Sequence, residues 1–250
     1  MRFCAWIHEC EPQATTLADL TEGLVVRWAE HLCNTGISGT TYNRYLVQVK
    51  RIYTVVTESS KSPFDRLEKQ RELHIQRQPI SWIDVQRIID FLPEASEEKL
   101  LVLLASYTSQ RLSDCIHIRA EDIEDGVWSL TQSKTGHRVQ IPLHSNILAT
   151  LPQSEGYLLP SLVDQYAASR ASISRWFKQV LSDLEIEEPN EVRNGRRSFH
   201  SLRHTSITRM QEMGTTPLVV QAIAGHTSLA MTMHYTHVTQ RQVEDAVALL

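Results

Sequence analysis

The residues best suited to chemistry lie in the last fifth of the 250-residue chain, where five of its eleven histidines fall. These are His200, His204, His226, His234 and His237. Arg203 follows His200 by three residues, and Tyr235 follows His226 by nine. Arginine binds phosphate oxygens through paired hydrogen bonds, and histidine moves protons near neutral pH. A phenol beside such groups can act as a nucleophile, so this stretch indicates a phosphodiester-handling site with Tyr235 as nucleophile.

Metal binding is an alternative use of the same stretch, because His200 and His204 have the i, i+4 spacing of zinc-binding helices. The metalloprotease motif places a glutamate directly after its first histidine, whereas this chain has Ser201 there. No nearby aspartate, glutamate or cysteine completes a clear ligand set, and Arg203 would repel a divalent cation. The sequence also lacks a Walker A or GxGxxG loop. We therefore expect no metal and no nucleotide cofactor.

Two upstream cations could complete an anion site. Arg111 follows a strongly apolar segment, and Asp114 lies three residues further on, where it would share a helical face with Arg111. Taken alone, the two could equally form an ordinary ion pair. Lys134 lies near the turn of a predicted β-hairpin and could simply be exposed to solvent. Combined with Arg203 and the histidines, these cations would neutralise the charge of a pentacoordinate phosphorane.

The elements that must position these residues are mostly helical. A 3.6-residue apolar period in residues 17–33 and 40–58 predicts a small all-helical domain, and the polar segment 59–80 is predicted to be an interdomain linker. Only residues 126–143 show a two-residue period, typical of a hairpin. Further helices are predicted at 81–92, 97–109, 163–184, 198–213, 216–224 and 240–250. The expected fold is mainly α with a small antiparallel β-sheet, divided into domains at residues 1–75 and 80–250.

Bulk composition does not by itself suggest a nucleic-acid partner. The net charge is −4. Residues 1–78 carry ten basic and nine acidic side chains, and the remainder carries fifteen and twenty. The four cysteines, at positions 4, 10, 33 and 115, include no CxxC pair, which suits a reducing compartment and inert buried thiols. No apolar run reaches a membrane-spanning length of roughly 18 residues, so a cytoplasmic protein without a membrane partner is expected.

Two strings near the end of the chain resemble motifs of the tyrosine recombinase (phage integrase) family, including Xer-like and mobile-element integrases. These are FHSLRHT, which begins at Phe199, and GHTSLAMTMHYTHV, which begins at Gly225. Arg111 and Lys134 precede them in the family's order and spacing. The resemblance covers about residues 80–240 and implies a mixed α/β catalytic domain. The preceding helices resemble the family's SAM-like core-binding domain, without its first helix and without a preceding arm-type domain.

The chain departs from the usual family pattern at two places. The family often has Thr-Gly before its first arginine, whereas here Thr108, Ser109 and Gln110 precede Arg111. Ala224 replaces a common leucine before the Gly-His pair. Neither change touches a catalytic group, so we expect activity.

The resemblance implies roles for four residues around the scissile phosphate. Arg111 and Arg203 would hold its non-bridging oxygens. Lys134 would protonate the 5′-oxygen leaving group from the hairpin turn. Asp114 matches the family's acidic position and would orient the cationic residues.

The resemblance also assigns the nucleophile and its neighbours. His200 would take part in transfer of the nucleophile's proton or donate a hydrogen bond to the phosphate. His226 would donate a hydrogen bond to the same phosphate. Tyr235 would attack, leaving a 3′-phosphotyrosine and a free 5′-hydroxyl.

The expected function is therefore site-specific recombination or integration of double-stranded DNA. A non-catalytic DNA-binding relative and a type IB topoisomerase-like enzyme remain alternatives. By resemblance we expect a homotetramer on synapsed DNA, a monomer or weak dimer when free, and a possible accessory DNA-bending protein. Residues 240–250 would pack on their own domain or, as the resemblance implies, dock on a neighbouring copy. DNA contacts are expected from a basic face made of Arg44, Lys50, Arg51, Lys134, Arg193, Arg196, Arg197 and Arg203.

Overall fold

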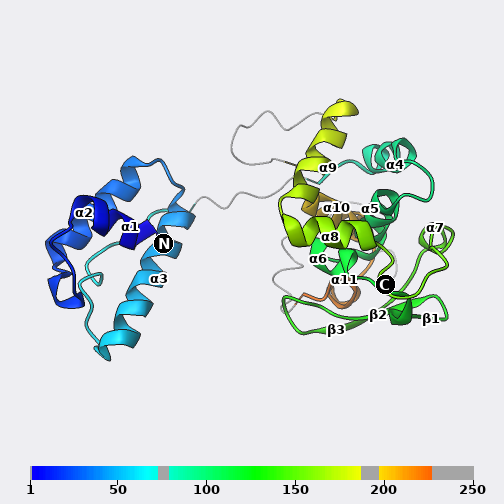
Figure 1. Cartoon of the computed structure of the whole chain (residues 1–250). Helices are drawn as coiled ribbons and strands as arrows, with labels where there is room; N and C mark the ends of the chain where they lie inside the picture. The colour runs from blue at the N-terminus through cyan, green and yellow to red at the C-terminus, as the bar shows by residue number, and fades with distance from the viewer. Residues whose placement is uncertain (1, 73–78, 187–196, 227–250) are drawn as a thin grey trace, which may run out of the picture. The chain divides into compact units, whose positions relative to one another are not determined.

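The structure is a computed structural model that describes residues 2–72, 79–186 and 197–226 (Figure 1). Four expectations fall outside these residues: the positions of Arg193, Arg196 and Tyr235, and the helix at 240–250. The described chain forms two compact units, the first ending at residue 72 and the second beginning at residue 79. Among the described residues, no helix combines the length and the apolar character that crossing a bilayer requires.

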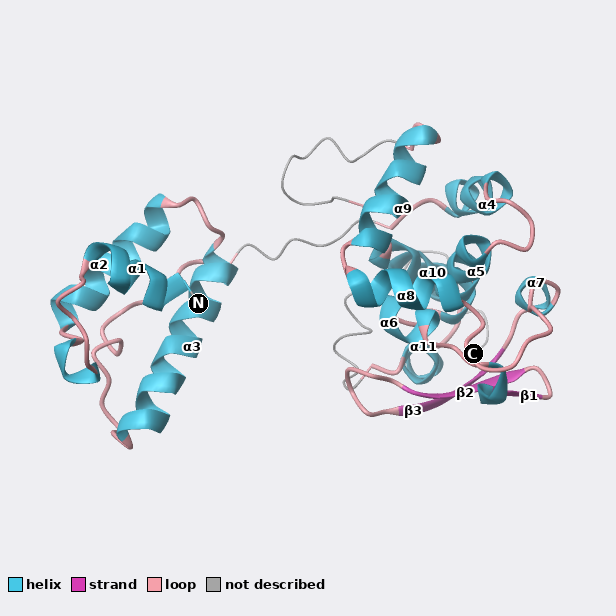
Figure 2. Cartoon of the chain, viewed as in Figure 1, coloured by secondary structure: helices cyan, strands magenta, loops and turns pink. Residues whose placement is uncertain are grey.

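The first unit is helical (Figure 2). It contains α1 (Arg2–Cys10), a 3₁₀ turn (Leu17–Asp19), α2 (Glu22–Asn34) and α3 (Gly39–Thr57). The side chains of Thr21 and Ser38 cap α2 and α3 by accepting hydrogen bonds from backbone N–H groups of the first turn. The core is aromatic: Phe3 and Phe64 both pack edge-on against Trp28. Helix α1 supplies Phe3, and the sequence reading did not foresee this helix.

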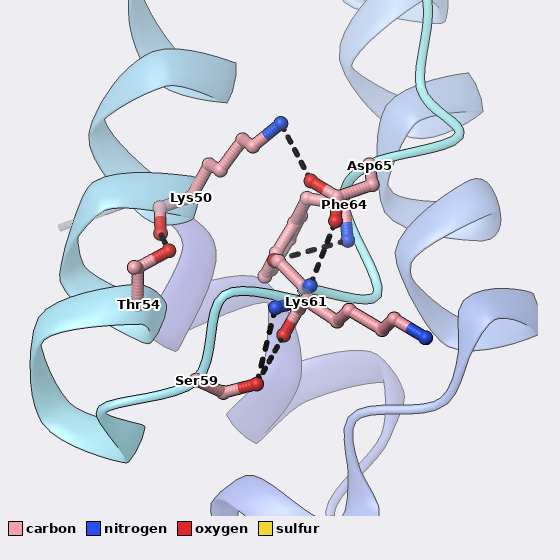
Figure 3. A network of polar contacts seen from close by, with 7 residues as sticks. Lys50, Thr54, Ser59, Lys61, Phe64 and Asp65 are labelled. Carbon is pink, nitrogen blue, oxygen red and sulfur yellow. Dashed lines mark hydrogen bonds and ion pairs between the residues drawn. The ribbon is translucent and has the colours of Figure 1, made fainter.

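Residues 59–72 belong to this first unit, so the predicted linker 59–80 was wrong over that range. Phe64 is fully buried in the aromatic core. The side-chain amide of Asn43 donates to the carbonyl of Gln70 at 2.9 Å and accepts from its N–H at 2.8 Å. In Figure 3, Lys50 of α3 forms an ion pair with Asp65 at 2.5 Å. A polar segment without periodicity is thus held by side-chain contacts that hydrophobic patterning cannot show.

The second unit is built around α5 (Glu97–Thr108), which lies among other helices in Figure 1. Every residue from Leu100 to Ala105 is at most 2% exposed, so α5 is apolar on all sides because neighbours cover all of it. The second unit also contains α4 (Trp82–Phe91), α6 (Leu112–Ile116), α7 (Ser145–Leu148), α8 (Pro160–Ala168), α9 (Ser172–Asp183), α10 (His200–Glu212) and α11 (Pro217–Ala224).

A three-stranded antiparallel sheet lies to one side of these helices (Figure 2). Its order is β1 (Ile123–Glu124), β2 (Val127–Thr131), β3 (Arg138–Pro142), with Trp128 opposite Ile141 and Leu130 opposite Val139. These pairs face the core, which explains the alternating pattern. The mainly α fold with a small antiparallel sheet is thereby confirmed, with the short β1 added to the predicted hairpin.

The cysteine expectation was largely wrong. Only Cys115 is buried, whereas Cys4, Cys10 and Cys33 are exposed. Burial raises the pKa of the Cys115 thiol far above its usual range, so this group stays a thiol. The three exposed positions lie on α1 and α2, and Sγ of Cys33 accepts a hydrogen bond from Gln70 at 2.8 Å.

Candidate active site

Arg111 is presented by a sharp turn between two helices. Helix α5 ends at Thr108, and the next residue, Ser109, adopts a left-handed conformation with φ 59°. Arg111 then occupies the N-cap position of α6, without a capping hydrogen bond from its side chain. A serine in this conformation is strained, whereas glycine adopts it freely. The hydroxyl of Ser109 lies 2.7 Å from that of Ser206 on α10, and Gln110 donates to the carbonyl of Ile223 at 2.7 Å. These contacts hold the turn in place.

Arg203 lies on α10, a helix that is polar in sequence yet buried. The side chain of Arg203 is only 4% exposed. Its guanidinium donates to the carbonyl of Ser109 and, at 2.9 Å, to the carbonyl of Ala224 at the end of α11. The neighbouring Thr205 exchanges hydrogen bonds of 2.8 Å with both backbone groups of Ile80. Buried polar groups require such partners, and these partners fix the helix rotation that places Arg203.

The two arginines are joined through one buried side chain that the sequence reading missed. Arg111 donates through Nη1 to Oε1 of Gln132 at 2.8 Å. The Nε2 of Gln132 donates to the carbonyl of Ala224 at 2.9 Å, the same carbonyl that accepts from Arg203. The sequence did carry a signal, because Gln132 continues the inward-facing series begun by Trp128 and Leu130. A glutamine at a core-facing position needs polar partners.

His226 lies directly beyond α11, after a left-handed Gly225. Its side chain is buried, with 5% exposure. Burial, followed by the positive charges of Arg203, Arg111 and His204, lowers the pKa of His226 from 6.5 to about 4. The imidazole is therefore neutral at pH 7 and can donate one hydrogen bond without adding charge.

His200 and His204 occupy successive turns of α10. His200 is the first residue of the helix and is half-buried, whereas His204 is 9% exposed. Their rings pack edge-on with centroids 4.9 Å apart. Within the described ranges, no group of three or more histidine, cysteine, aspartate or glutamate side chains is arranged as metal ligands would be.

Asp114 contacts the hairpin rather than Arg111. Its Oδ1 accepts from the N–H of Ser133 at 2.9 Å and from the hydroxyl of Ser133 at 2.7 Å. An ordinary ion pair was one interpretation of the i, i+3 spacing, but among the described residues no salt bridge joins Asp114 to Arg111. Asp114 instead anchors the residue before Lys134, which is exposed in the turn between β2 and β3.

The expected DNA-contacting residues lie in different settings. Arg44 and Arg51 are exposed and seven residues apart on α3, hence on one face. Lys50 is engaged by Asp65 (Figure 3). Arg197 is half-buried just before α10. Arg203 is buried, so it adds little exposed surface to the predicted basic face.

Comparison with known proteins gives a consistent result. A model described as the phage integrase family matches residues 80–242. Tyrosine recombinase XerA of Pyrococcus furiosus is 29% identical over 174 residues, covering 66% of this chain and 58% of that protein. The integrase of Escherichia phage P2 is 22% identical over 237 residues, covering 92% of this chain and 65% of that protein. The chain thus spans about three-fifths of the length of these relatives.

Solved structures share the fold. The integrase of transposon Tn1549, in complex with circular intermediate DNA, superposes with a TM-score of 0.69 at 16% identity, covering 98% of this chain and 91% of that one. A lambda integrase dimer bound to a core site gives a TM-score of 0.66 at 19% identity, covering 88% and 65%. At these identities the likeness concerns the fold.

Proposed function

Because the chain belongs to the phage integrase family, we propose that it breaks and rejoins duplex DNA as a site-specific recombinase. The observation that carries this proposal is the joined pair of arginines, Arg111 and Arg203, with neutral His226 beside them. Two fixed positive charges and one neutral donor suit the additional negative charge that a phosphodiester acquires when a fifth oxygen approaches phosphorus.

Charge stabilisation is the largest catalytic contribution of this arrangement. A preorganised donor aimed at developing charge is worth roughly 3–4 kcal/mol. Arg203 is held by backbone carbonyls, and Arg111 is held by Gln132, so neither guanidinium needs to reorganise during the reaction. Arg111 is only half-buried, and Gln132 is the sole hydrogen-bond partner of its side chain among the residues the structure describes. Its other N–H groups can therefore bind a phosphate.

In the covalent step, each bond that forms is matched by a bond that breaks, and each proton has a donor and an acceptor. The phenol oxygen of Tyr235 attacks phosphorus and loses its proton, for which His200 is the proposed acceptor. The bond between phosphorus and the 5′-oxygen breaks, and Lys134 gives that oxygen a proton. Attack by a 5′-hydroxyl on the phosphotyrosine then reverses these changes on the exchanged strand. One phosphodiester is consumed and one is formed, so the cycle needs no nucleotide.

The relatives and structural neighbours favour double-stranded DNA as partner, since several of them are complexes with DNA. We propose that residues 1–75 and 80–250 act as two domains that each contact the duplex. In this proposal four copies act on synapsed DNA in the cytoplasm, at the nucleoid. An accessory DNA-bending protein belongs to the same proposal.

Covalent capture tests the function. The protein is incubated with duplexes carrying a randomised central segment, the reaction is quenched with detergent, and the attached DNA is sequenced. We expect attached DNA with an enriched sequence for the wild type and none for Tyr235→Phe, which should still bind. Binding without attachment by the wild type would contradict a strand transferase. Relaxation of supercoiled plasmid without sequence enrichment would instead indicate a topoisomerase.

A further inference from the structure

Gln132 is a fully buried polar residue at the base of the hairpin turn that carries Lys134. Its own backbone closes that turn, because its N–H donates to the carbonyl of His137 at 2.9 Å and its carbonyl accepts from Gly136 at 2.9 Å. Burying an amide side chain is costly unless its hydrogen bonds are satisfied. The partners of Gln132 therefore indicate what its position serves.

The oxygen of the Gln132 amide faces two donors. Oε1 accepts from Arg111 Nη1 at 2.8 Å and from the hydroxyl of Thr135 at 2.9 Å. Thr135 is the residue that follows Lys134. One oxygen thus fixes the position of Arg111 relative to the turn that bears Lys134.

The nitrogen of the same amide faces two acceptors. Nε2 donates to Oε1 of Gln110 at 2.6 Å and to the carbonyl of Ala224 at 2.9 Å. That carbonyl also accepts from Arg203. Reversing the amide would oppose donors to donors and acceptors to acceptors, so the network determines its orientation. A continuous path consequently runs from Arg111 through Gln132 and Ala224 to Arg203.

The backbone at Gly225 is shaped to admit this amide. A Cβ at position 225 would lie 2.2 Å from Nε2 of Gln132 and 2.4 Å from its Oε1. Gly225 leads directly into His226. Gln132 therefore contacts Arg111 itself and the segments that carry Lys134 and His226, and it shares the carbonyl of Ala224 with Arg203.

We propose that Gln132 is a positioning residue that sets the spacing of the two arginines and links it to the turn of Lys134. This inference rests on the proposed function, because the spacing matters only if the arginines hold a phosphate. A displacement of about 1 Å in a catalytic constellation can slow a reaction on the order of 100-fold. Removing the amide should therefore slow the covalent step while leaving DNA affinity unchanged.

The test uses Gln132→Met, which keeps the length of the side chain and removes its hydrogen bonds. The matched control is Gln140→Met, since Gln140 is exposed on the adjacent strand and bonds only to Ser129 at 3.3 Å among described residues. Each variant of the full chain is mixed in excess with a duplex recovered by covalent capture. We measure the affinity for DNA, the rate constant of adduct formation and the final amount of adduct.

For Gln132→Met we expect a rate constant lower on the order of 100-fold, with affinity and final adduct retained. Gln140→Met should match the wild type. A structural defect would instead reduce the final adduct and leave the rate constant of the remaining active molecules unchanged, and that result would overturn the proposal. If the wild type forms no adduct with any duplex, the proposed function fails and this inference fails with it.

A second variant covers the case in which Gln132→Met does not fold. Thr135→Val removes one donor to Gln132 at a half-buried position in the turn. The free energy of one hydrogen bond corresponds to about a fivefold change in a rate constant, so adduct formation should slow by about that factor. An unchanged rate in Thr135→Val would contradict a role for this contact.

Discussion

Replacing Gly225 with alanine should destabilise the second unit far more than the same replacement at Gly214. Both glycines follow helices in the left-handed region, with φ of 63° and 82°. Alanine in that conformation costs about 1–2 kcal/mol. At Gly214 a Cβ would meet nothing within 4 Å, so this strain is the whole cost. At Gly225 the Cβ would overlap the amide of Gln132.

The additional cost at Gly225 follows from the hydrogen bonds that Gln132 must give up. Its amide makes four, two through each polar atom, and each buried group left unsatisfied costs about 1–3 kcal/mol. If the amide moves and half of these hydrogen bonds are broken, Gly225→Ala should lower the free energy of unfolding by roughly 3 kcal/mol more than Gly214→Ala does. For a unit of this size that difference corresponds to about 6–12 °C in melting temperature.

Thermal unfolding followed by circular dichroism measures this difference. The double variant Gly225→Ala with Gln132→Ala removes the overlap, so the two changes should be strongly non-additive. Equal losses of stability in Gly225→Ala and Gly214→Ala would refute the reasoning. So would a loss of stability in the double variant that equals the sum of the two single losses. Either result would mean that the amide of Gln132 does not fill the space beside Gly225.

Three further predictions concern charge. Because the pKa of His226 is about 4 when folded and 6.5 when unfolded, the unfolded chain binds more protons between these values. Stability should therefore fall as pH drops from 6.5 toward 4, and His226→Gln should flatten that slope in urea titrations. Asp114→Ala should loosen the turn of Lys134 and slow cleavage. A substrate with sulfur in place of the bridging 5′-oxygen should restore the cleavage rate, since a thiolate leaves without a proton. Equal slowing of cleavage on both substrates would contradict this role of Asp114. Replacing Arg44 and Arg51 with alanine should lower the slope of log affinity against log salt by about one each, whereas an unchanged slope would exclude phosphate contacts.

Asp114 and Gln132 show where sequence spacing is insufficient. The i, i+3 spacing of Arg111 and Asp114 predicts a shared helical face, but α6 is only five residues long and Arg111 precedes it in an extended conformation. The arginine points to Gln132 and the aspartate to Ser133, both of which lie on the hairpin. Long-range hydrogen bonds compete with local pairs, and only the folded chain decides which partner is closer.

In the first unit, the sequence pattern predicted a linker where the chain is in fact packed. Residues 59–72 have no periodicity and many charges, which is typical of a linker. Phe64 was the available signal, because a single large aromatic residue can anchor a polar segment to a core. Its partners Phe3, Trp28 and Tyr53 come from three different helices. No local pattern records such a combination.

The sequence by itself determined the family, the helical character of the chain, the hairpin and the order of the residues proposed for catalysis. These follow from local periodicity, turn residues and short motifs, all of which are encoded by neighbours along the chain. Only the tertiary structure decided that Arg203 is buried, that His226 is neutral and that Gln132 joins the two arginines. These properties depend on desolvation and on contacts between residues some twenty to ninety positions apart, as between Gln132 and Ala224. Such energies arise only when the whole unit has packed.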